Sequence, residues 1–100
     1  MLISVITVAW NAAATIDATC CSVDIQTHDE VEHLIIDGQS TDRTLETLAA
    51  RPSSRRTVFS EPDHGLYDAM NKGLARARGD IVVFLNADDR YRSADVLAQV

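Results

Sequence analysis

DIVVFLNADD, at residues 80–89, is an apolar run that ends abruptly at two adjacent carboxylates. Ile81 to Leu85 has the composition of a buried strand, and Asp88 and Asp89 follow its end. In an open α/β sheet, ligands bind in the crevice outside the carboxyl ends of the parallel strands. Hard divalent cations take oxygen ligands, and Mg²⁺ is often held by one or two carboxylates and by substrate phosphates. The acid pair therefore indicates a metal or phosphate site, with a polar turn before a helix as the alternative.

Strand and helix patterns alternate along the whole chain. Apolar, β-branched runs predict strands at Ile3–Val8, Val31–Asp37, Arg56–Ser60 and Ile81–Leu85. Apolar residues at helical spacing predict helices at Asn11–Val23, Ser40–Ala50, Leu66–Arg78 and Ser93–Val100. This alternation calls for parallel βαβ units with right-handed crossovers. The sequence thus predicts an α/β domain with a Rossmann-like parallel sheet and helices on both faces.

The expected strand order is 3-2-1-4, which places a topological switch point between the first and the fourth strand. The loops after the first, second and fourth strands then share one edge of the sheet. These loops are VAWN (8–11), DGQSTD (37–42) and NADD (86–89), three polar segments that each follow an apolar strand. Their convergence predicts a nucleotide site at this edge.

Composition and charge exclude several classes of protein. The chain has 100 residues, 46% hydrophobic and 24% charged, as in an ordinary soluble domain. The net charge of −6 argues against a nucleic-acid partner, because phosphate binding needs clustered Lys and Arg. No apolar run approaches the ~20 residues of a transmembrane segment, and the vicinal Cys20 and Cys21 fit a reducing compartment. We expect a cytoplasmic protein, with peripheral association at the inner face of the membrane left open and the oligomeric state unassigned.

Missing motifs narrow the kind of nucleotide site. The four glycines fit neither the Gly-x-Gly-x-x-Gly dinucleotide fingerprint nor the P-loop. The chain has no His-Glu-x-x-His, no paired-cysteine metal spacing and no Gly-x-Ser-x-Gly elbow. An NAD-binding domain, a P-loop ATPase, a zinc hydrolase and an α/β-hydrolase are therefore disfavoured.

Four segments, in this order and at this spacing, resemble the successive motifs of family 2 glycosyltransferases with the GT-A fold. The segments are SVITVAWN (4–11), IDGQSTDRT (36–44), SEPDHGLYDAMNKG (60–73) and GDIVVFLNADD (79–89). The resemblance covers nearly the whole chain. It implies a nucleotide-sugar donor, UDP-linked, a divalent metal (Mn²⁺ or Mg²⁺), and inverting transfer of the sugar to a hydroxyl of a glycan or lipid-linked acceptor. The sequence of residues 67–73, YDAMNKG, resembles that of a branch of the family that assembles bacterial exopolysaccharide, capsule and lipopolysaccharide. This resemblance implies a role in cell-surface polysaccharide biosynthesis.

The resemblance also implies roles for residues at the end of the first two strands. The segment Thr7–Trp10 would line the nucleobase pocket, through Trp10 or backbone groups near Val8, with core packing as the alternative for Trp10. Asn11 would also bind the nucleotide sugar. Asp37 would read the base by accepting a hydrogen bond from its N–H. Ser40 and Asp42, in the same loop as Asp37, are better explained as helix caps.

Residues of the third and fourth segments would complete the donor site. Asp68 and Asn71 would face the donor, and Asn86 would ligate or hydrogen-bond as a neutral group. Asp88 would contact the ribose or the metal, and Asp89 would carry the metal that bridges the diphosphate. Such a metal would neutralise the charge that develops on the leaving nucleoside diphosphate.

Three positions depart from the family pattern. Gly38 stands where members often have a second acid, Asn86 where they often have an aspartate, and Met70 where they often have an arginine. Because Gly38 replaces the second acid, Asp37 is the single acid directly after the second strand, and the resemblance implies uracil specificity less strongly.

The general base of this family lies in the half of the domain that follows the metal motif. We therefore expect residues 1–100 to form a nucleotide-binding subdomain, with the base carboxylate beyond Val100 and no transfer by these residues alone. A non-catalytic nucleotide-binding module is the first alternative. A response-regulator domain is the second, and it needs a lysine after a late strand, whereas Lys72 is expected in a helix.

Overall fold

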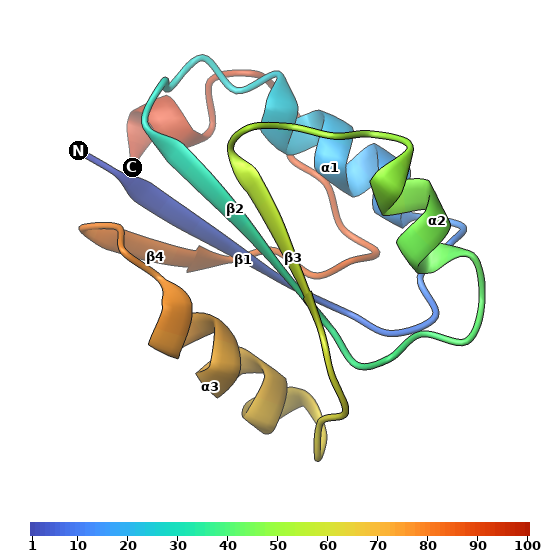
Figure 1. Cartoon of the computed structure of the whole chain (residues 1–100). Helices are drawn as coiled ribbons and strands as arrows, with labels where there is room; N and C mark the ends of the chain where they lie inside the picture. The colour runs from blue at the N-terminus through green and yellow to red at the C-terminus, as the bar shows by residue number, and fades with distance from the viewer.

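Four parallel strands form the central sheet in the computed structural model, which describes residues 1–100 (Figure 1). The strands are β1 (Ile3–Ala9), β2 (Val31–Asp37), β3 (Arg56–Ser60) and β4 (Ile81–Phe84). β1 pairs with β2 over its whole length, from Ile3 opposite Val31 to Ala9 opposite Asp37, and with β4 on its other side. The order is β3-β2-β1-β4, so the predicted order and direction of the strands are confirmed.

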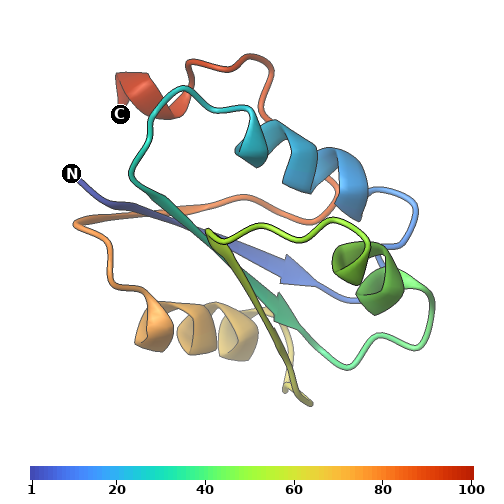
Figure 2. The ribbon, with the colours of Figure 1, turned by 45° about the horizontal axis from the view of Figure 1, so that its top comes forward.

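Helices cover both faces of the sheet, as predicted. α1 (Ile16–Asp24) and α2 (Thr44–Ala49) lie on one face, and α3 (Leu66–Arg76) lies on the other (Figures 1 and 2). A short 3₁₀ turn, η1 (Leu97–Gln99), lies on the α1 side close to the beginning of β1. No helix combines the length and the apolar character that a membrane span requires.

Two predicted helices begin later than expected because their first residues bond to each other instead. Asn11 has a positive φ of 49° and accepts the amide of Thr41 on its side-chain oxygen, 2.7 Å away. The amide of Ala12 donates to the Thr44 hydroxyl at 2.8 Å. The loops after β1 and β2 are thereby joined, and the helices start at Ile16 and Thr44.

The prediction of a helix over residues 93–100 is wrong. Only the turn η1 forms, because the side chain of Gln26 occupies backbone groups of this segment. Its amide donates to the Ser93 carbonyl at 2.7 Å, and its oxygen accepts the Leu97 amide at 3.0 Å. Gln26 is only 5% exposed, so the segment is held in an irregular course over α1.

The core divides between the two faces of the sheet with the two-residue period of a strand. Ile3, Val5 and Ala9 belong to the clusters on the α1 and α2 side, whereas Ile6 belongs to the cluster beneath α3. α3 approaches the sheet closely at Gly73, where an added Cβ would lie 2.5 Å from Ile6 Cγ2. The absence of a side chain at this position therefore allows the helix backbone to rest on β1.

Buried polar side chains lie within the sheet itself. His33, only 1% exposed, places Nε2 2.8 Å from the Thr7 hydroxyl on the neighbouring strand. Glu32 accepts the Ser4 hydroxyl at 2.5 Å and the Arg78 amide at 2.6 Å. Burial lowers the pKa of His33 to about 3, with a smaller contribution from the positive charge of Arg56. The imidazole is therefore neutral in the folded protein at physiological pH.

We expect Gly73→Ala to destabilise the protein. Alanine favours a helix over glycine by about 1 kcal/mol, but its Cβ would meet Ile6 in the core, and such overpacking costs about 1–3 kcal/mol. The free energy of unfolding, measured by urea denaturation, should fall by about 1 kcal/mol. Ala75→Gly, on the exposed part of the same helix, is the control and should cost about 1 kcal/mol through helix propensity alone. A Gly73→Ala variant more stable than the wild type would contradict the close approach of α3 to β1.

We expect His33 to destabilise the fold in mild acid. Below pH 6.5 the unfolded chain takes up a proton at this imidazole that the folded chain does not bind, until the pH reaches the folded pKa of about 3. Stability is therefore full above pH 6.5 and is lost as the pH falls, by about 2 kcal/mol between pH 7 and pH 5. Urea denaturation across this range measures the slope, and His33→Leu should remove most of it. An equal slope in both proteins would show that His33 is not the titrating group.

Candidate functional site

The loops after β1, β2 and β4 meet at one edge of the sheet, as the predicted order requires. The Asn11 amide donates to the Ser40 hydroxyl at 2.8 Å, which joins the first loop to the second. The hydroxyls of Thr15 and Thr19 donate to the Ala87 carbonyl at 2.8 and 2.9 Å, which joins α1 to the loop after β4. Polar side chains thus fix the relative positions of the three loops.

A cavity of about 390 Å³ opens between the end of β1, the loop after β4 and the start of α3. It is lined by Val8, Trp10, Asn11, Ala12, Thr15, Leu66, Asn86, Ala87 and Asp88. Five of these were predicted site residues, namely Val8, Trp10, Asn11, Asn86 and Asp88. The side chain of Trp10 is 64% exposed, so core packing does not explain it.

Leu66 is a cavity residue that the sequence did not indicate. It is the first residue of α3, and its side chain is 55% exposed although it is large and apolar. The sequence marked it only as the first residue of the helix predicted at Leu66–Arg78. The available signal was a large apolar residue at the start of a predicted helix, directly after the polar segment 60–65. The fold gives this signal its meaning, because it places Leu66 in the same cavity as the loop after β4.

The acid pair lies on a turn immediately after β4. The turn is closed by the Asp89 amide, which donates to the Asn86 carbonyl at 3.0 Å. Asp88 lines the main cavity and also a smaller one of about 250 Å³, in which Asp89 and Arg90 face residues of α1. Both aspartates are exposed, and neither carboxylate accepts a hydrogen bond or forms an ion pair within the protein. Their oxygens are therefore free to bind a ligand.

The donor atoms of the acid pair suit a hard divalent cation. The chain has no group of three or more His, Cys, Asp or Glu side chains that could hold a metal without help. Mg²⁺ and Mn²⁺ accept oxygen ligands, and Mg²⁺ keeps open positions for substrate phosphates when one or two carboxylates hold it. Asp88 and Asp89 fit this second arrangement, in which the metal would bind together with a phosphorylated ligand.

Asp37 lies in a different position from the one expected for contact with a base. Its side chain is fully buried, and its oxygens accept the Ser40 amide at 3.0 Å, the Ser40 hydroxyl at 2.5 Å and the Ser60 hydroxyl at 2.8 Å. Asp37 therefore ties the ends of β2 and β3 to the loop after β2, and it does not line the cavity. Ser40 takes part in this network and is not a helix cap.

Asp42 does stabilise the start of α2. Its carboxylate accepts the Thr44 amide at 2.9 Å and the Thr44 hydroxyl at 2.5 Å, and it also accepts the Ala13 amide at 3.2 Å. These hydrogen bonds, that of the Thr44 hydroxyl above all, lower the pKa of Asp42. Asp42 thus stabilises the start of the helix from the position before the N-cap residue, Arg43, which makes no side-chain capping bond of its own.

Asp68 and Asn71 stand apart from the other predicted residues. Asp68 accepts the His64 amide at 2.9 Å and lies 3.4 Å from the Lys72 ammonium. The His64 amide and the Lys72 charge lower the pKa of this carboxyl. Asn71 is exposed on α3, and neither residue lines the cavity. In this structure Asp68 closes the first turn of α3.

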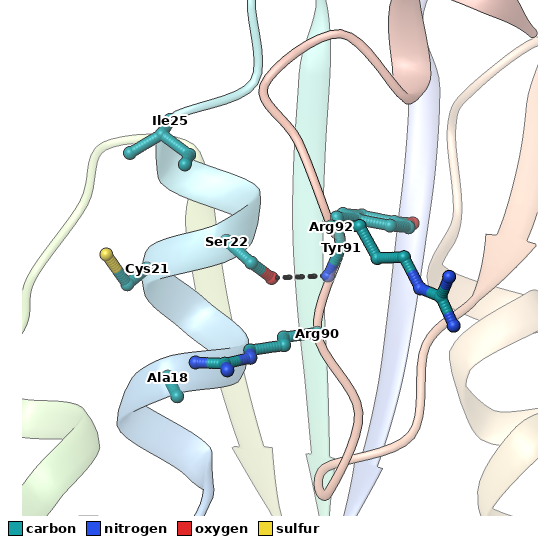
Figure 3. Close-up of a pocket in the computed structure, with 7 residues that line it drawn as sticks. All are labelled: Ala18, Cys21, Ser22, Ile25, Arg90, Tyr91 and Arg92. Carbon is teal, nitrogen blue, oxygen red and sulfur yellow. Dashed lines mark hydrogen bonds between the residues drawn. The ribbon is translucent and has the colours of Figure 1, made fainter.

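A basic cavity of about 410 Å³ lies between α1 and the segment that follows the acid pair (Figure 3). It is lined by Ala18, Cys21, Ser22, Ile25, Arg90, Tyr91 and Arg92. The Tyr91 amide donates to the Ser22 hydroxyl at 3.1 Å and fixes the segment against α1. In Figure 3 Arg90 extends from this segment across α1 toward Ala18, and it also lines the smaller cavity of the acid pair. Arg90 thus brings a positive charge to the small cavity that Asp88 and Asp89 also line.

Comparison with known proteins shows which family the chain belongs to. The profile of glycosyl transferase family 2 matches residues 4–100, nearly the entire chain. The chain belongs to glycosyl transferase family 2.

Three curated relatives are named glycosyltransferases. An uncharacterized glycosyltransferase of Mycobacterium tuberculosis is 41% identical over 98 residues, which cover 97% of this chain and 37% of the relative. A PGL/p-HBAD biosynthesis glycosyltransferase of Mycobacterium bovis is 38% identical over 102 residues, 99% of this chain and 40% of the relative. The putative teichuronic acid biosynthesis glycosyltransferase TuaG of Bacillus subtilis is 38% identical over 94 residues, 91% of this chain and 37% of the relative. The chain thus spans about two fifths of the length of these relatives.

Solved structures of similar fold contain nucleotide sugars. S. aureus TarS, in a complex with UDP-GlcNAc, superposes with a TM-score of 0.90 at 27% identity, covering 99% of this chain and 30% of that one. The mannosyltransferase PcManGT of Pyrobaculum calidifontis, in a complex with GDP-Man and Mn²⁺, gives 0.88 at 28% identity, covering 96% and 30%. These likenesses confirm the GT-A fold that the resemblance of the four sequence segments implied.

We expect Asp37→Ala to destabilise the protein, because it removes the acceptor of three hydrogen bonds in a buried position. A buried donor left without a partner costs about 1–3 kcal/mol, so the free energy of unfolding should fall by about 2 kcal/mol or more. Urea denaturation measures the change. Asp29→Ala, at an exposed carboxylate near the opposite edge of the sheet, should change stability by less than about 0.5 kcal/mol. Equal stability of Asp37→Ala and wild type would contradict the structural role of this network.

Proposed function

We propose that this chain is the nucleotide-sugar-binding part of a glycosyltransferase that transfers a sugar from a nucleoside-diphosphate donor, UDP-linked, to an acceptor hydroxyl. The observation that carries the proposal is the cavity at the switch point between β1 and β4, with the free acid pair at its edge. The position is where ligands bind in open α/β sheets, and the volume falls in the range of small-molecule sites.

Within this cavity we assign the nucleoside to the wall formed by Val8, Trp10 and Asn11. Trp10 offers an exposed aromatic ring for stacking, and Leu66 adds an apolar surface from α3. Asn86 and Asp88, on the opposite loop, would then lie beside the ribose and the diphosphate. TarS and PcManGT, which share the fold, hold nucleotide sugars of different bases in their solved complexes, UDP-GlcNAc and GDP-Man.

The diphosphate requires a partner for its negative charge, and we propose a divalent cation, Mn²⁺ or Mg²⁺, held by Asp88 and Asp89. When bound, the cation supplies charge neutralisation of the leaving nucleoside diphosphate. Both carboxylates are exposed and without partners, and PcManGT contains Mn²⁺ in its solved complex. Arg90, which lines the same small cavity as the two acids, adds a positive charge there. The protein's part is to hold the acids on a turn that hydrogen bonds from Thr15 and Thr19 attach to α1.

The acceptor and the stereochemistry are proposed from the family. We infer inverting transfer to a hydroxyl of a glycan or lipid-linked acceptor, in cell-surface polysaccharide biosynthesis. The names of two relatives support the last point, since one is assigned to PGL/p-HBAD biosynthesis and one to teichuronic acid biosynthesis. The free thiols of Cys20 and Cys21 support a reducing compartment, the cytoplasm.

Calorimetric titration of UDP and of GDP tests the proposal. With Mn²⁺ present we expect saturable binding, and with EDTA we expect the affinity to fall by roughly 10-fold or more, because the diphosphate loses its cation. Asp89→Ala should reproduce the EDTA result even in the presence of Mn²⁺, and Asp88→Ala should weaken binding as well.

Asp29→Ala is the matched control, since it removes an exposed carboxylate just before the start of β2, at the opposite end of the strand from the site, and should leave binding unchanged. Binding that is indifferent to both Mn²⁺ and Asp89 would identify a nucleotide-binding module without the metal chemistry. Absence of nucleotide binding under all conditions would contradict the assignment of the cavity.

A further inference from the structure

Asp63, which lies in the loop between β3 and α3, holds a carboxylate oxygen in the space above Gly38. A Cβ built on Gly38 would lie 2.6 Å from Asp63 Oδ2 and 3.3 Å from Asp63 Cγ. The same Cβ would lie 3.5 Å from Trp10 Cδ1. Asp63, Gly38 and Trp10 therefore meet at one point, although they come from three different loops.

The two oxygens of Asp63 have different surroundings. Oδ1 accepts the Gly65 amide at 3.1 Å, which shapes the turn before α3. Oδ2 has no donor within the protein, and Asp63 forms no ion pair. The residue is half-buried, so the free oxygen is held in place rather than extended into bulk solvent. A fixed acceptor without a partner, beside an exposed aromatic ring, is suited to a ligand that brings an N–H group.

Asp37 cannot supply this acceptor in the folded structure. Its oxygens are buried and are occupied by Ser40 and Ser60. Asp63 instead offers a carboxylate near Trp10 that is held in position by the Gly65 amide and whose Oδ2 accepts no hydrogen bond within the protein. The glycine at position 38 provides the space in which it stands, because any side chain there would displace Oδ2.

We propose that Asp63 is a specificity-determining residue that accepts a hydrogen bond from the ring N–H of the donor's nucleobase. The inference rests on the proposed function, since it needs a nucleotide stacked against Trp10. Uracil carries a ring N–H at N3 and guanine carries one at N1, so both bases present the required donor. A base whose ring nitrogen bears no hydrogen at this position brings a lone pair toward the carboxylate, and the two repel.

The test compares nucleotides that differ only in this N–H. Calorimetry of the 100-residue chain with Mn²⁺ measures the dissociation constants of UDP and N3-methyl-UDP, and of GDP and N1-methyl-GDP. Wild type should bind the methylated form of its preferred nucleotide at least roughly 10-fold more weakly, as expected for loss of a hydrogen bond to a charged group. The UDP and GDP arms show which of the two bases the site prefers.

Asp63→Asn is the informative variant, because its side-chain oxygen can still accept the Gly65 amide while an NH₂ group replaces Oδ2. We expect it to bind the unmethylated nucleotide roughly 10-fold more weakly than wild type and to discriminate little between methylated and unmethylated forms. Gly38→Ala should give the same two effects by displacing Oδ2, and the double variant should lose less than the sum of the two. Thermal unfolding of each variant close to that of wild type shows that the fold is retained.

Two results would overturn the inference alone. One is wild-type binding that is indifferent to methylation of the ring nitrogen. The other is an Asp63→Asn variant that binds and discriminates as wild type does. If wild type binds no nucleotide at all, both this inference and the proposed function fail, so the two failures are distinguished by the wild-type titration.

Discussion

The parallel pairing of β1 with β2 on one side and with β4 on the other determines where every residue of the candidate site lies. Ala9 stands opposite Asp37, and Ile6 stands opposite Phe84, so the loops that follow β1, β2 and β4 leave the sheet at the same edge. β2 and β3 follow β1 on one side of the sheet, whereas β4 pairs with β1 on the other side. The connecting helices α1 and α3 therefore cover opposite faces, and a crevice is left between the ends of β1 and β4 (Figure 2). Trp10 and Asp88, far apart in sequence, line one cavity for this reason.

Hydrogen bonds between the loops convert this shared edge into a defined site. Asn11 is bonded to the loop after β2, Thr15 and Thr19 are bonded to the loop after β4, and Asp37 joins the ends of β2 and β3. These contacts satisfy polar groups that the strand ends would otherwise leave without partners. They use most of the polar side chains at the edge, and they leave Asp88, Asp89 and Asp63 Oδ2 free. A ligand thus meets a preformed surface on which only a few acceptors are available.

The sequence predicted the fold well because strand periodicity and βαβ alternation are local signals. It predicted five of the residues that line the cavity, since each lies at or shortly after the end of an apolar strand. It failed where a distant partner decides the outcome. The late start of α1 depends on Thr41 and Thr44, and the irregular course of residues 93–100 depends on Gln26. The burial of Asp37 depends on Ser60, which the sequence separates from it by a whole helix. The position of Asp63 above Gly38 is likewise invisible until β2 and β3 are placed side by side.

We propose that a divalent cation and the nucleotide diphosphate bind together at the edge of the sheet where the carboxyl ends of β1, β2 and β4 lie. Paramagnetic broadening of amide NMR signals by Mn²⁺, in the presence of UDP, locates the cation directly on the folded chain. We expect selective loss of signals from residues 10–15 and 86–90, whereas signals from the opposite edge, around Asp29 and Asp80, should be preserved. Broadening centred on Asp29 and Asp80, or uniform broadening that shows no site, would contradict this proposal.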